Sequence, residues 1–316
     1  MGIVSTPGAT ALTSTELVRR RLRGSRVDVS GRSFELFLLL TLLVSLAILL
    51  VLVTDVVQGG APVFADRAGH FLTSGISSNP DTAGVWQGVR GTLTIAVFVI
   101  VISFPMGIAA ALYMEEYAPD SRLSRFVDVN IRNLAGVPSI VYGLLGFALF
   151  VRALDGVTGG RTVIAAGLTL AVLVLPIVII TSAEAVRAVP GSLREAGYGV
   201  GATQWEVIRH HVLPYAAPGI LTGTVLSLAR ALGEAAPLIL VGAVTGFFSE
   251  SGGFLDKLQG KFTALPMQVF QFARQPSGEF RNELGSATIV VLLVMILTIN
   301  AAAILLRNRY ERKRTG

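Results

Sequence analysis

TVIAAGLTLAVLVLPIVIITSAEAV, residues 162–186, carries a single charged side chain, that of Glu184, in 25 consecutive positions. As an α-helix the stretch would be about 37 Å long, which exceeds the ~30 Å hydrocarbon core of a bilayer. The core of a soluble domain does not require apolar runs of this length. The stretch therefore predicts a transmembrane helix.

Five further segments on either side of this stretch pass the same length test. They cover residues 34–57, 92–114, 133–154, 218–242 and 286–306. Only 15% of the residues are charged and the mean hydropathy is +0.67, whereas soluble domains carry about 25% charge. We predict an all-α integral membrane protein with six transmembrane helices. Four of them contain a proline and should be kinked there: Pro105, Pro138, Pro176 and Pro237.

The positive charges favour one orientation in the membrane. If the amino terminus is cytoplasmic, 17 of the 26 Lys and Arg residues fall in cytoplasmic segments and eight in external ones. Positive residues accumulate on the cytoplasmic side of membrane proteins. We therefore predict a multi-pass protein of the plasma or inner membrane, with both termini in the cytoplasm.

The spans leave two tails and several polar loops. Residues 1–33 read as a basic, partly disordered tail, 34–306 as the six-helix transmembrane domain, and 307–316 as a second basic tail. The external loops 58–91 and 243–285 are long, and the second is rich in phenylalanine. It needs cover from the membrane surface, from a partner subunit or from small helices of its own. Glu115 and Glu116, which end the second span, are expected to lie in solvent.

Several classes of function are excluded by residues that the chain lacks. It has no cysteine, and its three histidines form no recognisable metal-binding motif. Gly260-Lys261 lacks the upstream glycine and the following Ser or Thr of a P-loop, so the chain should not bind ATP or act alone as an ATPase. The net charge of +6 lies mostly at the chain ends and does not indicate binding to nucleic acid. No cofactor or metal site is predicted in this chain.

The polar loop 187–217 has its own helical signals. Ser192 with Glu195 and Thr203 with Glu206 have the spacing of capping boxes, which begin helices. Gly197, Gly199 and Gly201 lie between them, and Pro214 follows the second. We predict two short helices that are joined at a glycine elbow, with Pro214 ending the second helix. Their apolar faces suit either the membrane surface or a protein partner.

This loop resembles the coupling loop of ABC importer permeases, which in that family docks on the ATPase subunit. The matching residues are Glu195, Ala196 and Gly197, then Gly201, and then Leu213 and Pro214. Gly197 stands where the family usually has alanine, and His211 stands where it often has isoleucine. The resemblance implies that these six positions couple the chain to an ATPase.

Two further stretches resemble the permeases of phosphate importers. They are VPSIVYG at 137–143 and ARALGEAAPL at 229–238, and the second is closer to the PstA type than to its PstC partner. The resemblance covers roughly residues 34–314 and implies the type I fold of ABC importer permeases. It also implies a PstC-type permease partner, two PstB-type ATPases that bind ATP and magnesium, and an extracytoplasmic PstS-type phosphate-binding protein.

Arg230 and Glu234 lie deep in the predicted span 218–242. An arginine near the bilayer centre costs about 2.5–3.5 kcal/mol, so this helix face should line the bundle interior or a wet cavity. At a spacing of four residues the two side chains can meet on one helical face. Arg230 could bind two phosphate oxygens with its planar guanidinium. The alternative is a structural salt bridge, and the resemblance favours a place in the substrate path.

Other functions stay open at this stage. The chain could be a permease of the same class for a different oxyanion, since sulfate or phosphonate would also pair with an arginine. It could be an autonomous secondary anion transporter, although its halves show no obvious internal duplication. A membrane enzyme would need a nucleophile–base pair or metal ligands within the membrane, and the sequence shows none.

Overall fold

The computed structural model describes residues 29–243 and 258–315, and all regular secondary structure in these ranges is helical. The predicted all-α class is therefore confirmed. Five helices are long and apolar enough to cross a membrane, and one sharply bent helix pair provides a sixth candidate. The chain divides into two compact units, 1–54 and 55–316. Within the described range, the first unit contributes only the beginning of helix α2.

Helix α2 (Val29–Thr73) continues well beyond the predicted first span and is kinked at Arg67, whose backbone is non-helical (φ −150°, ψ 35°). The next helix, α3 (Trp86–Leu112), begins at Trp86. The predicted external segment 58–91, whose structure the sequence left open, is therefore helical for most of its length. The Gly59-Gly60 pair there does not break the helix. It allows close packing, because a Cβ atom at Gly60 would lie 2.9 Å from the backbone of Ala287.

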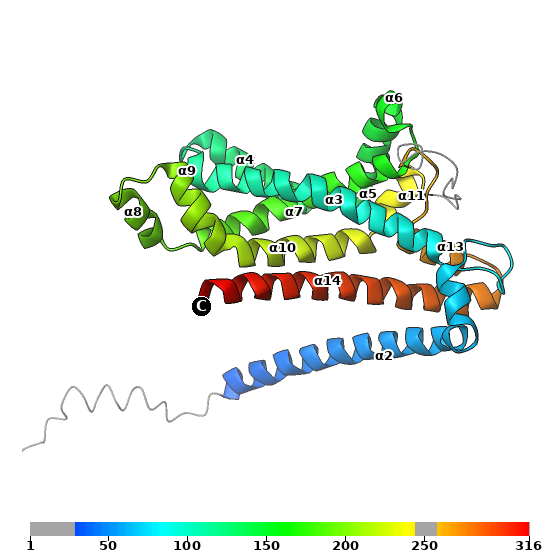
Figure 1. The fold of residues 1–316 in the computed structure, drawn as a ribbon. Coiled ribbons are helices and arrows are strands. Elements are labelled where there is room, and N and C mark those ends of the chain that lie inside the picture. The colour runs from blue at the N-terminus through cyan, green and yellow to red at the C-terminus, as the bar shows by residue number, and fades with distance from the viewer. Residues whose placement is uncertain (1–28, 244–257, 316) are drawn as a thin grey trace, which may run out of the picture. The chain divides into compact units, whose positions relative to one another are not determined.

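Helix α7 (Val163–Arg187), which was predicted as a transmembrane helix over residues 162–186, forms the centre of the larger unit. Helices α3, α4, α5 and α10 all pack against it (Figure 1). The hydroxyl of Ser103 in α3 donates a buried 2.8 Å hydrogen bond to the carbonyl of Ala171 in α7. Gly107 brings the two backbones close, since a Cβ atom there would lie 2.5 Å from Val178 Cγ1. Apolar packing and small residues thus hold this pair together, as is usual for helices in lipid.

The third predicted span, 133–154, is divided in the structure. Amphipathic α4 (Arg122–Ala135) ends before Gly136, and α5 (Ser139–Gly146) starts after Pro138 at an angle of 100°. Proline has no N–H to donate and disfavours helical geometry in the residue before it, so the chain breaks here rather than kinking. The π-helical turn η2 (Phe147–Ala153) extends α5. Together they span about 22 Å, which is less than a full bilayer core.

The fifth predicted span, 218–242, is divided as well. Helix α10 (Leu213–Gly233) ends at Gly233, Glu234 is extended (φ −81°, ψ 116°), and α11 (Ala236–Val241) follows. The predicted kink at Pro237 is therefore a complete break, with Pro237 in the first turn of the new helix. Both broken spans meet, because α11 packs on α5.

The external loop predicted at 243–285 contains small helices in its described part. They are α13 (Leu265–Ala273) and the π-helical turn η4 (Glu279–Leu284), which leads into α14 (Gly285–Thr315). Phe262, Phe272 and Phe280 are buried, so the segment covers much of its own aromatic surface. Residues 244–257, with Phe247, Phe248 and Phe254, lie outside the described residues.

Gly146→Val tests the close contact between α5 and α7. A Cβ atom at Gly146 would overlap the side chain of Thr169, whose hydroxyl is held by the Ala165 carbonyl. Overpacking of this kind costs roughly 1–3 kcal/mol. We expect a lower thermal midpoint for the purified protein in detergent. Gly156→Ala is the control, because no atom would lie within 4 Å of its new Cβ; equal midpoints for both variants would contradict the packing.

Candidate functional site

The charged pair Arg230 and Glu234 lies at the break between α10 and α11, where the candidate membrane span Gln204–Gly233 ends. Arg230 is in the last turn of α10, and Glu234 is the extended residue that follows it. The guanidinium Nε and the carboxylate Oε1 are 3.9 Å apart, which is too long for a direct hydrogen bond. The Glu234 carboxylate therefore partly compensates the positive charge of Arg230, and it leaves the planar face and the N–H donors of the guanidinium accessible.

The sequence predicted that Arg230 and Glu234 lie close together, but it placed both side chains on one helical face, and that geometry is wrong. Glu234 is not on the helical face of Arg230, because the helix has already ended. The Arg230 side chain is 59% exposed and that of Glu234 is 22% exposed in this single chain. An arginine cannot face hydrocarbon at low cost, so this side of the chain requires a partner or water in the membrane.

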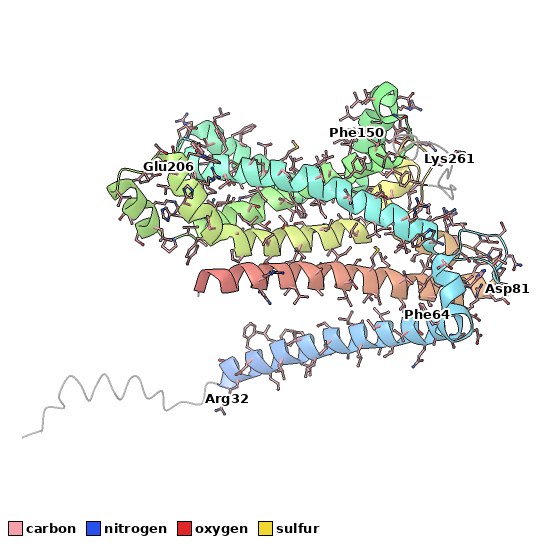
Figure 2. All side chains as sticks on the ribbon, viewed as in Figure 1. Arg32, Phe64, Asp81, Phe150, Glu206 and Lys261 are labelled. Atoms are coloured by element: carbon pink, nitrogen blue, oxygen red, sulfur yellow. The ribbon has the colours of Figure 1, made fainter. Side chains whose placement is uncertain are left out.

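The second candidate site is at the opposite end of the bundle, around α8 and α9. Figure 1 shows these helices at the end remote from α6 and α11, and Figure 2 labels Glu206 there. Helix α8 (Gly191–Gly199) packs against α9 (Gln204–Val207) and the π-helical turn η3 (Ile208–Val212). We call this end of the molecule the α8 end, and the opposite one the α6 end, after helix α6 (Asp155–Thr158).

One of the two predicted capping boxes is present. The Thr203 hydroxyl accepts from the Glu206 backbone N–H, and the Glu206 carboxylate accepts from the Thr203 backbone N–H at 2.8 Å. The box predicted at Ser192 and Glu195 is wrong: α8 begins after Pro190, and Ser192 lies within the helix without a capping bond. Pro190 occupies the N-cap position and fixes the backbone there, so Ser192 lies two positions too late to cap the helix.

Of the three glycines in the predicted elbow, only Gly201 has the positive φ that the turn requires, at +83°. Its N–H donates to the Tyr198 carbonyl, and the N–H of Ala202 donates to the Gly197 carbonyl. This pair of bonds is the Schellman motif, which ends α8 at a left-handed glycine. Gly199 is the last residue of α8 and is not part of the turn.

Gly197 has a packing role in α8. It is buried, and a Cβ atom there would lie 2.7 Å from Val207 Cγ2. Glu195 and Ala196, its neighbours, are exposed. The same helix thus uses its glycine to approach α9 and keeps the other two matched residues on the surface.

Pro214 does not end the second helix as predicted. The helix runs without interruption from Gln204 to Gly233, and Leu213 and Pro214 form the first turn of α10. The turn before them is π-helical, with the Leu213 N–H bonded to the Ile208 carbonyl. This wider turn accommodates the missing N–H and the bulk of the proline ring. Helix α9 is therefore continuous with α10, which carries Arg230 in its last turn.

A set of ion pairs that sequence reasoning missed anchors this loop. Glu116, whose side chain is only 5% exposed, accepts three hydrogen bonds from Arg194 of α8, and the shortest is 2.7 Å. The Gln204 side chain donates to the backbone carbonyl of Glu116. Glu115 accepts from Arg187 Nε at 3.1 Å. The expectation that Glu115 and Glu116 lie in solvent is wrong, and no local sequence signal joins groups that are 72 and 78 residues apart.

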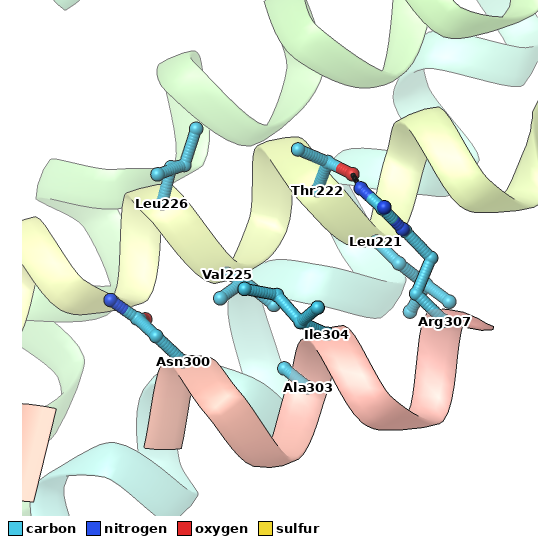
Figure 3. A pocket seen from close by; sticks show the side chains of 8 residues that line it. All are labelled: Leu221, Thr222, Val225, Leu226, Asn300, Ala303, Ile304 and Arg307. Atoms are coloured by element: carbon cyan, nitrogen blue, oxygen red, sulfur yellow. Dashed lines mark hydrogen bonds between the residues drawn. The ribbon is translucent and has the colours of Figure 1, made fainter. Parts of the chain in front are cut away.

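The cleft between α10 and α14 does not resemble an anion site. Its volume is about 130 Å³, and it is lined mostly by apolar side chains: Leu221, Thr222, Val225, Leu226, Asn300, Ala303, Ile304 and Arg307 (Figure 3). Arg307 reaches from α14 and donates a 3.1 Å hydrogen bond to Thr222 Oγ1. This contact joins the two helices.

Exposed apolar side chains surround the α8 turn. Val200 is 84% exposed and Trp205 is 55% exposed, and the side chain of Tyr198 is exposed as well. An exposed apolar group beside polar residues is typical of a protein contact. The geometry thus places an exposed apolar turn at one end of the helix Gln204–Gly233 and a charged pair at its other end.

Comparison with known proteins finds a matching family and relatives with a common name. Residues 103–316 match the family described as binding-protein-dependent transport system inner membrane component. The phosphate transport system permease protein PstA 1 of Mycobacterium tuberculosis (strain ATCC 25618 / H37Rv) is 36% identical over 252 residues, covering 78% of each chain. The phosphate transport system permease protein PstA of Yersinia pestis is 33% identical and is matched over 73% of this chain and 76% of its own.

Solved structures of ABC transporters share the fold. A chain of a bacterial ABC transporter for import of the acidic polysaccharide alginate aligns with a TM-score of 0.61 and 16% identity, over 89% of this chain and 98% of that one. A chain of the inward-facing MetNI methionine ABC transporter aligns with a TM-score of 0.56 and 20% identity, over 74% and 99% of the respective chains.

Glu116→Gln tests the anchoring of α8. The change removes the charge that holds Arg194, and charged hydrogen bonds contribute roughly 1.5–3 kcal/mol. We expect faster amide hydrogen exchange over 191–199 and a lower thermal midpoint. Asp120→Asn is the control, because the Asp120 side chain is 98% exposed and its contact with Arg125 is 3.9 Å. Equal amide exchange over 191–199 in both variants would show that the pair of Arg194 and Glu116 does not stabilise α8.

Gly201→Ala tests the turn after α8. A residue with a Cβ is strained at a φ of +83°, by about 1 kcal/mol. We expect the end of α8 to fray, seen as faster amide exchange around Tyr198 and Ala202. The matched variant Gly199→Ala, in a helical position with open space around its new Cβ, should protect these amides equally well or better. The opposite order would contradict the assignment of the turn to Gly201.

Proposed function

Because the chain belongs to the family of binding-protein-dependent transport system inner membrane components, we propose that it is the PstA-type permease subunit of an ATP-driven phosphate importer. Family membership makes it a permease subunit of an ABC importer. Phosphate rests on the names of the relatives and on an arginine placed near the end of the candidate membrane span Gln204–Gly233. That placement of Arg230 is the observation that carries the proposal.

The proposed complex supplies what this chain lacks. A PstC-type permease covers the exposed side of Arg230 and completes the path. Two PstB-type ATPases bind ATP and magnesium at the α8 end, which lies in the cytoplasm with both termini, including the basic tails 1–33 and 307–316. A PstS-type binding protein delivers phosphate at the α6 end. The permease domain, 34–306, connects the two sides.

Arg230 is proposed to contact the phosphate anion during transfer. Its guanidinium can hold two oxygens at once, and its charge does not depend on pH in the physiological range. Glu234 is too far away to occupy these donors but close enough to balance the charge when the path is empty. Phosphate would then take over the role of this carboxylate while it passes.

The α8 turn is proposed to transmit movement from the ATPase. Glu195, Ala196, Gly197 and Gly201 shape the docking helix and its turn, and Leu213 and Pro214 connect it to α10. The uninterrupted helix from Gln204 to Gly233 supports this role, because a shift at its first turn is carried to Arg230. The anchor between Arg194 and Glu116 would bring α3 into the same movement.

Arg230→Gln separates the anion role from coupling. In the complex co-purified with its ATPase and binding protein, we expect normal subunit content and basal ATP hydrolysis. Stimulation of hydrolysis and uptake by phosphate should fall at least 100-fold, since a bidentate charged contact is lost. Arg230→Lys should retain part of the activity. Unchanged phosphate uptake by Arg230→Gln would refute the role of this residue.

Glu195→Ala tests the other end of α10 in the same complex. Glu195 is exposed on α8, so the chain itself should remain stable. We expect less ATPase to co-purify, or ATP hydrolysis that no longer responds to phosphate. Ser192→Ala, also exposed on α8, is the control. Normal coupling in Glu195→Ala would place the docking contact elsewhere.

A further inference from the structure

Two arginines at the α6 end share one aromatic ring. The guanidinium carbon of Arg152 is 5.2 Å from the centre of the Phe147 ring, and that of Arg161 is 5.7 Å from the same point. The two guanidiniums therefore lie no more than about 11 Å apart. Like charges at this distance repel each other unless an anion or solvent compensates them.

The local backbone creates this arrangement. Phe147 and Arg152 are five residues apart, and in an α-helix such residues do not share a face. Here they belong to the π-helical turn η2, in which the Leu154 N–H bonds to the Leu149 carbonyl. A π-helical turn has bonds between residues five apart and therefore brings Arg152 over Phe147. Such turns are often found at functional sites.

The charge of the pair is not neutralised by a direct ion pair. In the described part of the chain no carboxylate lies within 4.0 Å of Arg152 or Arg161. Asp155 is the nearest acidic residue in sequence, and its carboxylate lies over Gly160. Both arginines are exposed, and Lys261, also exposed, adds a third positive charge at the same end of the bundle (Figure 2).

The pair is connected to the intramembrane charges through α11. A Cβ atom at Gly242, which follows α11, would lie 2.5 Å from Arg161 Cδ, so this arginine lies directly across the end of that helix. Glu234 lies just before the start of α11, and the six-residue helix is only about 9 Å long. A small anion released at Arg161 would thus be within a short distance of Arg230.

We propose that Arg152 and Arg161, held on Phe147, form an outer binding site for an inorganic oxyanion, which receives the anion before it reaches Arg230. This inference rests on the proposed function. The ring holds each guanidinium by a cation–π contact, while the N–H groups at the edge stay available for oxygen. One guanidinium fixed on the ring can present two N–H groups to the oxygens of an anion such as phosphate, and the second arginine adds positive charge beside it.

Binding of radiolabelled inorganic phosphate to the nucleotide-free permease–ATPase complex in nanodiscs, without binding protein, tests the site. Arg152→Gln/Arg161→Gln should raise the dissociation constant about tenfold, because charged hydrogen bonds are lost. Phe147→Leu keeps both charges but removes their support, and should weaken binding less. Arg274→Gln is the matched control: Arg274 is also exposed and lies 5.3 Å from the centre of a single ring, Phe270.

Unchanged phosphate binding by the double variant would overturn the outer site. Binding of the anion-free binding protein to the same complexes is measured separately. If the double variant lost affinity only for that protein, the arginines would be a protein contact, and the proposal would also fail. Neither result affects the proposed function, provided that the wild-type complex takes up phosphate with ATP. Failure of the wild-type complex to do so would refute the proposed function itself.

Discussion

The proposed transport path depends above all on one contact, that between α5 and α11. Each helix begins after a break in its span, and neither is long enough to cross a bilayer alone. A Cβ atom at Gly143 would lie 2.8 Å from the Pro237 Cα, so the two backbones are nearly in contact. Non-helical backbone at membrane depth is tolerated only where protein or water covers it. This contact allows Glu234 to be extended beside Arg230.

The α8 end is built on a different principle. Its helices are held by charged groups in addition to apolar packing, with Arg194 bonded to Glu116 and to the carbonyls of Val186 and Val189. These bonds fix the base of the loop, while the tip around Val200 remains exposed. A rigid base and an apolar tip suit the docking role proposed for this loop. Under that proposal, the uninterrupted helix that follows would carry a movement of the loop to the other end of α10.

Local signals in the sequence predicted part of the local structure. Apolar length identified the membrane helices, and the spacing of Thr203 and Glu206 identified a true capping box. The break at Pro138 could not be foreseen, because a proline in a membrane helix can equally be kinked or end the helix, and packing decides which. The pairing of Glu116 with Arg194 was equally hidden, since it depends on how α3 and α8 meet in space. The substrate, too, follows from relatives and not from the arginine alone.

ATP-dependent uptake by proteoliposomes is the most direct test of the account. The chain would be reconstituted with its permease partner, ATPases and binding protein, and radiolabelled phosphate would be supplied outside with ATP enclosed or omitted. Accumulation of phosphate only when ATP and all partners are present is the predicted result. Uptake by this chain alone, without ATP, would contradict the importer function and would indicate an autonomous secondary transporter.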